Sequence, residues 1–510
     1  MSLGFVVGES KPTSVTAITS RSLSVGEYIK ISIDEGEILG LVERSSVSSA
    51  AFTDVKNFHE AEESTEIADI NKRDKTFTAH IGILGFLDNL RKGQSIIPAI
   101  PPIPGTEITH PTNQDLEEIF SPKKEGWLKI GNLLRNKEIE AKINLDKIVS
   151  RHLGILAMTG MGKSNLVSLI TKKISEVKGT VIIFDYHNDY TTLNIPNVNV
   201  IDAKINPRLL EADQFSEVLE IRENADVQQR VLRMSFTQEV KEAGEFWNKL
   251  EYEVASLVNS EDKKLKEIRT SAYRVQDIIE DAQRRFDDIL DPEVGNPMDY
   301  IKEGYTNIIN ISELSEKQAN VAMGFYLQQL LKDRKNATIA KHGKSKKQKD
   351  YKFFEPVFII LEEAHVFIPK DHDTAAKYWA AKIAREGRKF GVGLAIVSQR
   401  PRSVDLNILS QMGSFAIMKI IQEDDQRQIA SATESTSREL ISQLTSLNVG
   451  DAVLVGQWTN LPSMVHVEEV KEKKMGADQS ATKAWIKADK MKNVGGESSQ
   501  GLVQKDLLLD

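Results

Sequence analysis

The residues best suited to chemistry lie in a glycine-rich turn near residue 160. Residues 152–167 read HLGILAMTGMGKSNLV, which predicts an apolar strand, a turn and the opening of a helix. Glycines let backbone N–H groups point inward at phosphates, with a helix amino terminus behind them, while the lysine bridges the β and γ phosphates and the serine ligates Mg²⁺. We therefore predict an ATP-binding P-loop made of Thr159, Gly160, Met161, Gly162, Lys163, Ser164 and Asn165.

Two adjacent acids, Glu362 and Glu363, follow a continuously apolar run at 357–361. A P-loop ATPase needs one carboxylate near the hydration shell of the metal and a second to orient or deprotonate water. Because adjacent side chains on a strand point to opposite faces, the two acids must differ in role. We assign Glu362 to Mg²⁺ through water and Glu363 to catalysis.

Further polar residues follow two other apolar runs. Gln399 comes after the run at 393–397, and ligands of open parallel sheets bind at the carboxyl edge, so Gln399 is a candidate sensor of the γ-phosphate. Asp185, His187 and Asp189 follow an earlier run. A coupling role behind the metal ligands and simple helix capping both remain open for these three residues.

Arg385 and Arg388 lie three residues apart on one face of a predicted helix. Two such arginines beside acids are usually surface ion pairs. In a ring ATPase they would instead reach across an interface to the γ-phosphate of a neighbour, where such an arginine is worth about 10³-fold or more in rate. Both interpretations remain open.

The elements that must position these residues begin near residue 147, where strands, turns and helices alternate as in a parallel α/β sheet. A long helix packed against another is predicted by a seven-residue repeat of Leu265, Ile268, Ala272, Val275, Ile279, Ala282, Phe286 and Ile289. Ser315 and Gln318 form a capping-box pattern that opens a further helix.

The first 145 residues have a different texture, with short strand-like runs and no long helix. In one run Ile29, Ile31 and Ile33 share a face, a period of two that predicts a half-buried strand. Together with candidate strands at 76–87, 127–130 and 139–143, this favours a small barrel as the first domain.

Composition limits the function classes. The charge balance of 66 − 74 = −8 does not indicate a general nucleic-acid or anionic-membrane binder, so any such contact must be local. The nine Lys and Arg of segment 332–352 predict an exposed basic loop, either a solvated connection or an element that faces DNA. The absence of cysteine excludes disulfides and thiolate chemistry. No apolar run approaches the ~20 residues of a membrane span, so we expect a cytoplasmic protein without a membrane partner.

The motifs TGMGKSN, DYHNDY, LEEAHVF, AREGRKFGVGLAIVSQRP and GDAVLVG, in this order, resemble the archaeal HerA DNA translocases of the HerA and FtsK branch of RecA-like ATPases. The resemblance covers nearly the whole chain. It implies a homohexameric ring with double-stranded DNA in its pore, ATP and Mg²⁺ between subunits, and the NurA nuclease as partner. Ala157 and Glu362 depart from the commoner P-loop pattern, but the backbone donors and the carboxylate remain.

Several residue roles follow from this resemblance alone. Arg388 resembles the trans-acting arginine of the family, and Lys370 resembles a lysine that binds DNA in the pore. Arg151 matches a further functional arginine, although its place before the P-loop strand also suits a strand cap.

The resemblance also gives the expected domain organisation. We expect an α/β fold with an N-terminal β-barrel at 1–145, a RecA-like ATPase core at 146–204 and 304–470, a helical insertion at 205–303, and a tail at 471–510 that braces the neighbouring subunit. The expected function is an ATP-driven DNA translocase and helicase that acts in DNA end processing and double-strand break repair. The alternatives are a nucleotide-switched clamp that is not a motor, and a secretion or DNA-transfer motor of the same branch.

Overall fold

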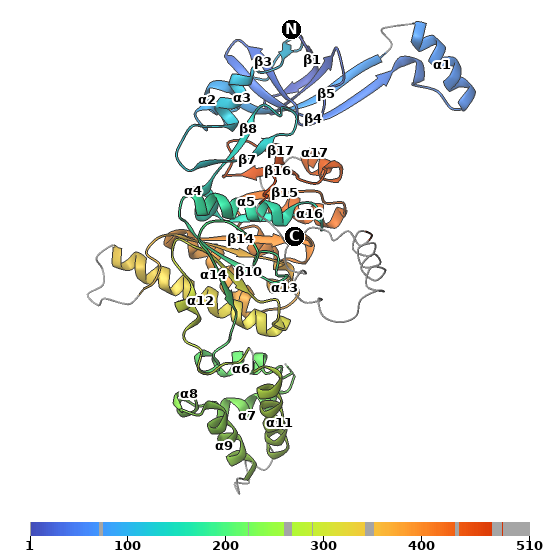
Figure 1. Cartoon of the computed structure of the whole chain (residues 1–510). Helices are drawn as coiled ribbons and strands as arrows, with labels where there is room; N and C mark the ends of the chain where they lie inside the picture. Colours follow the sequence, from blue (N-terminus) through green and yellow to red (C-terminus); the bar gives the residue numbers. More distant parts are fainter. Residues whose placement is uncertain are drawn as a thin grey trace, which may run out of the picture.

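The computed structural model describes residues 2–70, 75–222, 224–259, 268–287, 289–341, 351–433, 438–471 and 482. Figure 1 shows a barrel at one end, a large sheet with its helices in the middle, and a group of helices at the other end. The expected tail at 471–510 lies outside the described residues except for Lys471 and Thr482. Within the described chain, no helix is long and apolar enough to cross a membrane.

The predicted N-terminal barrel is present and closed, with strand order β1-β2-β5-β4-β3-β6. Its strands are β1 Gly4–Lys11, β2 Ser14–Thr19, β3 Tyr28–Ile33, β4 Gly36–Ser49, β5 Lys75–Phe86 and β6 Glu107–Thr109. Ile29 and Ile31 are fully buried inside the barrel, as their alternation predicts. β4 and β5 run on beyond the barrel toward α1 (Phe58–Ile70) as a projecting arm (Figure 1).

The joint between barrel and core buries a residue on the other face of β3. The ring of Tyr28 packs 4.8 Å from that of Phe120 in α3 (Asn113–Phe120), and its hydroxyl donates a hydrogen bond to the carbonyl of Pro462 at 3.2 Å. The outer face of β3 is therefore partly covered by the rest of the chain.

The strands predicted at 127–130 and 139–143 form, but they do not belong to the barrel. They are β7 (Trp127–Leu133) and β8 (Glu140–Asn144), and β7 pairs with β17 (Ser463–Val467) at the end of the large sheet. A Cβ at Gly131 would lie 2.0 Å from the carbonyl oxygen of His466, so glycine permits this close pairing. Placing these strands in the barrel was wrong because their apolar side chains pack with the P-loop strand and helix.

The large sheet has eleven strands in the order β11-β12-β10-β13-β14-β9-β15-β16-β17-β7-β8. The first seven are parallel, and the last four continue the sheet antiparallel. The strands not yet given are β9 Leu153–Leu156, β10 Thr180–Asp185, β11 Val198–Asp202, β12 Thr306–Asn310, β13 Val357–Leu361, β14 Val392–Ser398, β15 Ser414–Ile417 and β16 Asp451–Gly456.

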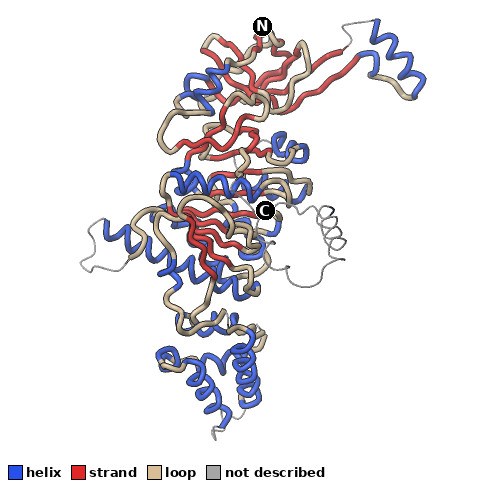
Figure 2. Tube along the Cα trace, in the orientation of Figure 1, coloured by secondary structure: helices blue, strands red, loops and turns tan. Residues whose placement is uncertain are grey.

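Helices cover both faces of the parallel part, which explains its continuously apolar strands. Along β13, Phe358 and Ile360 pack with α5 (Lys163–Glu176), whereas Ile359 packs with α12 (Glu316–Lys341) and α14 (Ala375–Glu386) on the other face. The tube in Figure 2 shows these strands between the helices. The remaining helices of barrel and core are α2 Leu87–Arg91, α4 Leu145–Arg151, α13 Ala364–Phe367, α15 Leu406–Leu409, α16 Glu423–Ala432 and α17 Arg438–Ser442.

The predicted helical insertion is also present. It contains α6 Ala212–Val218, α7 Asp226–Ser235, α8 Gln238–Glu242, α9 Phe246–Asn259 and α11 Arg269–Arg285. The seven-residue repeat is buried from Ile268 to Phe286, while Leu265 lies outside the described residues. The predicted capping box is confirmed, because Ser315 N–H donates to Gln318 and Gln318 N–H donates back to the Ser315 hydroxyl.

The basic segment at 332–352 is not simply an exposed loop. Residues 332–341 form the last turns of α12, and Arg334 is buried there. Residues 342–350 lie outside the described part of the chain. The prediction of an exposed loop was wrong for residues 332–341. Composition does not show that Arg334 is buried, because its hydrogen-bond partners are backbone carbonyls of distant residues.

Candidate active site

The turn between β9 and α5 has the backbone shape that phosphate binding needs. Gly160 and Gly162 both have positive φ, +78° and +100°, and Lys163 is the first residue of α5. Among the described residues nothing accepts a hydrogen bond from the N–H groups of Gly160, Gly162, Lys163 or Ser164. These donors at a helix amino terminus fit the phosphates of a nucleotide. Ala157 is buried in the core and donates its N–H to Ser398, so it continues the strand and its methyl group does not disturb the turn.

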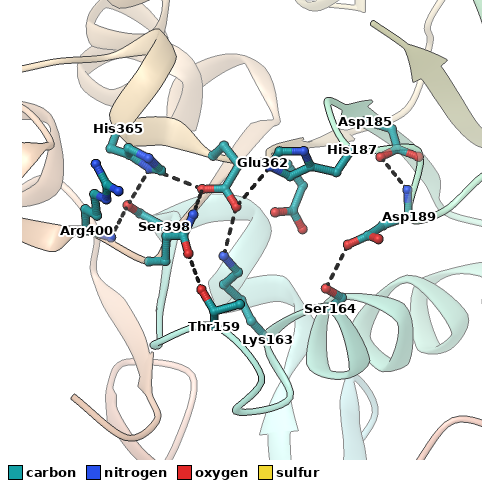
Figure 3. A network of polar contacts seen from close by, with 12 residues as sticks. Thr159, Lys163, Ser164, Asp185, His187, Asp189, Glu362, His365, Ser398 and Arg400 are labelled. Atoms are coloured by element: carbon teal, nitrogen blue, oxygen red, sulfur yellow. Dashed lines mark hydrogen bonds and ion pairs between the residues drawn. The ribbon is translucent and has the colours of Figure 1, made fainter. Parts of the chain in front are cut away.

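Glu363 contacts three side chains that Figure 3 labels, which are Lys163, His187 and His365. One carboxylate oxygen lies 3.2 Å from Lys163 Nζ and 3.6 Å from His187 Nε2. The other accepts a hydrogen bond from Gln399 Nε2 at 3.4 Å and lies 3.2 Å from His365 Nδ1. The structure therefore brings together the predicted lysine, catalytic acid and sensor, and adds two histidines.

The backbone at Glu363 is left-handed, with φ 46° and ψ 44°. Such a conformation is uncommon for a residue other than glycine and clusters at functional sites. Because β13 ends at Leu361, the turn sends Glu362 and Glu363 to different partners. The two acids differ in surroundings, as predicted, although the cause is this turn and not strand alternation.

Glu362 lies in a separate buried contact. It accepts a hydrogen bond from the hydroxyl of Tyr190, which is completely buried. Burial raises the pKa of Glu362 to about 7, while the nearby charge of Lys163 opposes that rise. No role was predicted for Tyr190, and the available signal was an aromatic residue directly after Asp189.

Asp185 and Asp189 differ in role: Asp185 caps a turn, whereas Asp189 contacts the P-loop serine. Asp185 accepts hydrogen bonds from the N–H groups of Asp189 at 2.9 Å and Tyr190 at 2.8 Å, and so caps the turn after β10. Burial raises the pKa of Asp185, although these hydrogen bonds lower it. Asp189 in turn accepts a hydrogen bond from the hydroxyl of Ser164 at 3.1 Å. The oxygens of Ser164, Asp189 and Glu362 are hard donors of the kind that Mg²⁺ prefers.

The other predicted P-loop residues make protein contacts. The Thr159 hydroxyl bonds to the side chain of Gln399, and the Met161 carbonyl accepts the N–H of Gly450 at 3.1 Å. Asn165 donates to the carbonyl of Glu468 at 2.9 Å and accepts the N–H of Val470 at 2.8 Å. The Asn165 side chain therefore fastens segment 468–470 to α5.

Arg388 and Arg151 lie at the opposite edge of the sheet. Arg388 is in the 3₁₀ turn η4 (Gly387–Phe390) before β14, and Arg151 is the last residue of α4 before β9. The seven residues of β14 separate this edge from the P-loop edge, a span of about 20 Å at ~3.3 Å per residue. Arg388 is exposed, and among the described residues it has no acidic partner, so the surface ion pair considered for it does not form.

Lys370 is exposed in the loop after α13, at the carboxyl edge of the sheet. Its backbone N–H donates to the carbonyl of Ser403 at 3.0 Å, and Pro369 forms an isolated bridge with Val404. Within the described residues the Lys370 side chain forms no hydrogen bond or ion pair with the P-loop network. It is free to meet a ligand from outside the subunit.

A mainly parallel sheet with a P-loop, a carboxylate on the next-but-one strand and a polar side chain at the end of the strand between them defines a RecA-like P-loop ATPase. A family model described as the central domain of the helicase HerA matches residues 128–330. Two proteins named DNA double-strand break repair helicase HerA, from Sulfolobus acidocaldarius and Sulfurisphaera tokodaii, are 35% and 36% identical to the chain, and each alignment covers 96% of this chain and 97% of the relative. VirB4 of Thermoanaerobacter pseudethanolicus aligns with a TM-score of 0.49 at 15% identity, over 68% of this chain and 98% of its own. The chain belongs to the HerA family of ATP-dependent helicases.

Proposed function

We propose that the chain is an Mg²⁺-ATP-driven translocase and helicase of double-stranded DNA that acts in double-strand break repair. The observation that carries the motor assignment is the contact of Glu363 with both Lys163 and Gln399. A catalytic acid, a phosphate-binding lysine and a γ-phosphate sensor in one cluster form a hydrolytic apparatus, which a clamp without turnover does not need. The names of the two HerA relatives support DNA repair as the context.

We further propose that the active unit is a homohexameric ring that feeds DNA ends to the NurA nuclease for resection. The separation of the arginines from the P-loop supports the ring, since Arg388 and Arg151 lie at the edge of the sheet opposite to the P-loop of their own subunit. In head-to-tail packing, a neighbour would bring this edge to the P-loop edge. Lys370 would then contribute to the path of the DNA.

The ATPase rate with and without blunt duplex DNA tests the motor. Strong stimulation by linear duplex is expected. A rate that does not respond to duplex DNA would contradict a DNA motor and favour the secretion motor of the same branch.

Mixing two inactive variants tests the trans arrangement. Arg388→Ala retains a working P-loop, and Lys163→Ala retains a working arginine, so mixed rings contain interfaces that combine the two intact parts. Partial recovery of ATPase activity is expected when subunits exchange. Mixed rings with no recovery would place Arg388 outside the neighbour's ATP site.

A further inference from the structure

Two basic residues near the end of α12 hold the chain on either side of Arg388. Lys335 Nζ lies 2.5 Å from a carboxylate oxygen of Glu386, two residues before Arg388. Arg334 Nε donates to the carbonyl of Phe390, two residues after Arg388, at 3.0 Å. The Lys335 ammonium also lies 5.1 Å from the centre of the Phe390 ring, a cation–π contact.

The Arg334 contact is a built feature of the interior. The residue is only 4% exposed, and Nη1 donates to the carbonyl of Phe353 at 2.8 Å. Within the described chain no carboxylate forms an ion pair with this guanidinium, and burial lowers its pKa against the opposing charges of Glu355, Asp333 and Glu303. Because a buried polar group is costly when it is left without partners, these two hydrogen bonds hold Arg334 between Phe353 and Phe390.

The backbone around η4 is adapted to this contact. Gly391 has φ +66°, and a Cβ there would lie 3.1 Å from Arg334 Nη2. At the other end of η4, a Cβ at Gly387 would lie 2.6 Å from the carbonyl oxygen of Val392. Glycine at both ends therefore lets η4 lie close to α12 and β14.

A single 3₁₀ turn has poor hydrogen-bond geometry and little stability of its own. Its amino end also has no side-chain cap. The direction of Arg388 is therefore set by what fastens Glu386 and Phe390. We propose that Arg334 and Lys335 are positioning residues that hold η4 so that Arg388 enters the ATP site of the neighbouring subunit. This inference rests on the proposed trans action of Arg388.

Arg334→Met in the full chain tests the inference, because it removes the donors and keeps much of the volume. A misplacement of about 1 Å in a catalytic group costs on the order of 10²-fold, so kcat should fall about 10- to 100-fold in assembled protein. The variant should still bind ATP, because its own P-loop lies at the other edge of the sheet. Arg334→Lys, which can reach only one of the two carbonyls, should give an intermediate loss. Lys332→Met is the matched control: Lys332 is exposed on the same helix, and its replacement should leave turnover unchanged.

Mixing separates positioning from a general structural role. Lys163→Ala subunits carry an intact Arg334 and Arg388, so they should restore turnover at the P-loops of Arg334→Met subunits. Damage that spread to the variant's own ATP site would not be rescued by a neighbour. If Arg388→Ala is rescued by Lys163→Ala and Arg334→Met is not, this inference is overturned and the proposed function stands. If neither is rescued, the proposed trans action of Arg388 falls and this inference falls with it, while stimulation by duplex DNA still tests the motor separately.

Lys335→Met keeps the inference falsifiable if Arg334→Met does not fold. Lys335 is partly exposed, with 29% of its side chain accessible, so its loss should be tolerated by the fold. Turnover should fall several-fold and recover on mixing with Lys163→Ala. The inference is overturned if assembled Arg334→Met hydrolyses ATP as fast as the unaltered protein. If only Lys335→Met folds, the same result in Lys335→Met overturns it.

Discussion

Glu363→Gln removes a charge from the centre of the site while keeping the shape of the side chain. The Glu363 side chain is 6% exposed and contacts Lys163 and Gln399, so the amide has little room to move away. Positioned acid–base groups contribute about 10²- to 10⁴-fold to rate. We expect kcat for ATP hydrolysis to fall by a factor in that range.

Although Glu363→Gln lowers the rate of hydrolysis, it should not weaken the binding of ATP. Glu363 competes with the phosphates for Lys163, and two unit charges 3.2 Å apart attract by about 5 kcal/mol at an effective dielectric constant of ~20. Much of that attraction is offset by desolvation, but a residual 1.4 kcal/mol is tenfold in affinity. The variant should bind ATP as tightly as the unaltered protein or up to about tenfold more tightly.

Equilibrium binding of a fluorescent ATP analogue and steady-state hydrolysis measure the two effects separately. Glu362→Gln is the matched control, because Glu362 contacts Tyr190 and not Lys163. It should increase the Mg²⁺ concentration needed for binding and retain most turnover at saturating Mg²⁺. Weakened ATP binding by Glu363→Gln, or an exchange of the two phenotypes, would refute the assignment of the acids.

Three further predictions concern single positions. Tyr190→Phe should leave the fold intact and raise the Mg²⁺ concentration for half-maximal ATPase activity, since Glu362 loses its hydrogen-bond donor; an unchanged Mg²⁺ titration would remove Tyr190 from the metal site. Burial lowers the pKa of His152 to about 4, from 6.5. The unfolded chain therefore binds the proton first as pH falls, and His152 should cost stability at up to ~1.4 kcal/mol per pH unit between about pH 6.5 and pH 4. His152→Gln should flatten that part of a denaturation series, and equal slopes would contradict the prediction. Lys370→Ala should reduce DNA-stimulated ATPase activity more than the basal rate, whereas equal losses would assign the lysine to the fold.

The sequence was most informative where the determinants are local. A short, continuously apolar run bounded by polar residues predicted β13, because a strand that is buried on both faces has apolar side chains along its whole length. Ser315 and Gln318 predicted the start of α12 because both partners of the capping box lie within one turn. The contact of Lys163 with Glu363 spans 200 residues, and it became predictable only because each motif has a known place at the carboxyl edge of such a sheet.

Pairing that depends on distant segments was not predictable. The alternation in β7 and β8 suits an edge hairpin of a barrel or of an open sheet equally well, and the choice depends on β17, over 300 residues later. The Tyr190 hydroxyl donates a hydrogen bond to Glu362, 172 residues later in the sequence, and no local sequence pattern predicts this contact. Likewise Arg334 resembles its exposed neighbours in sequence, and only the packing of α12 against η4 and Phe353 buries it.

The internal contacts of α12 also change the charge argument for DNA. Arg334 and Lys335 bind protein groups, so they are not available to neutralise phosphates on a chain whose net charge is −8. The exposed Lys370 is therefore expected to make a larger share of the contact with DNA. Each phosphate that a protein neutralises contributes about −0.9 to the slope of log affinity against log salt concentration. In the proposed hexamer, six equivalent lysines would give a slope of about −5, whereas a DNA path that touches one subunit at a time would give about −1. The loss of salt dependence in Lys370→Ala therefore measures how many subunits hold the duplex at once, because one substitution removes the same contact from every subunit.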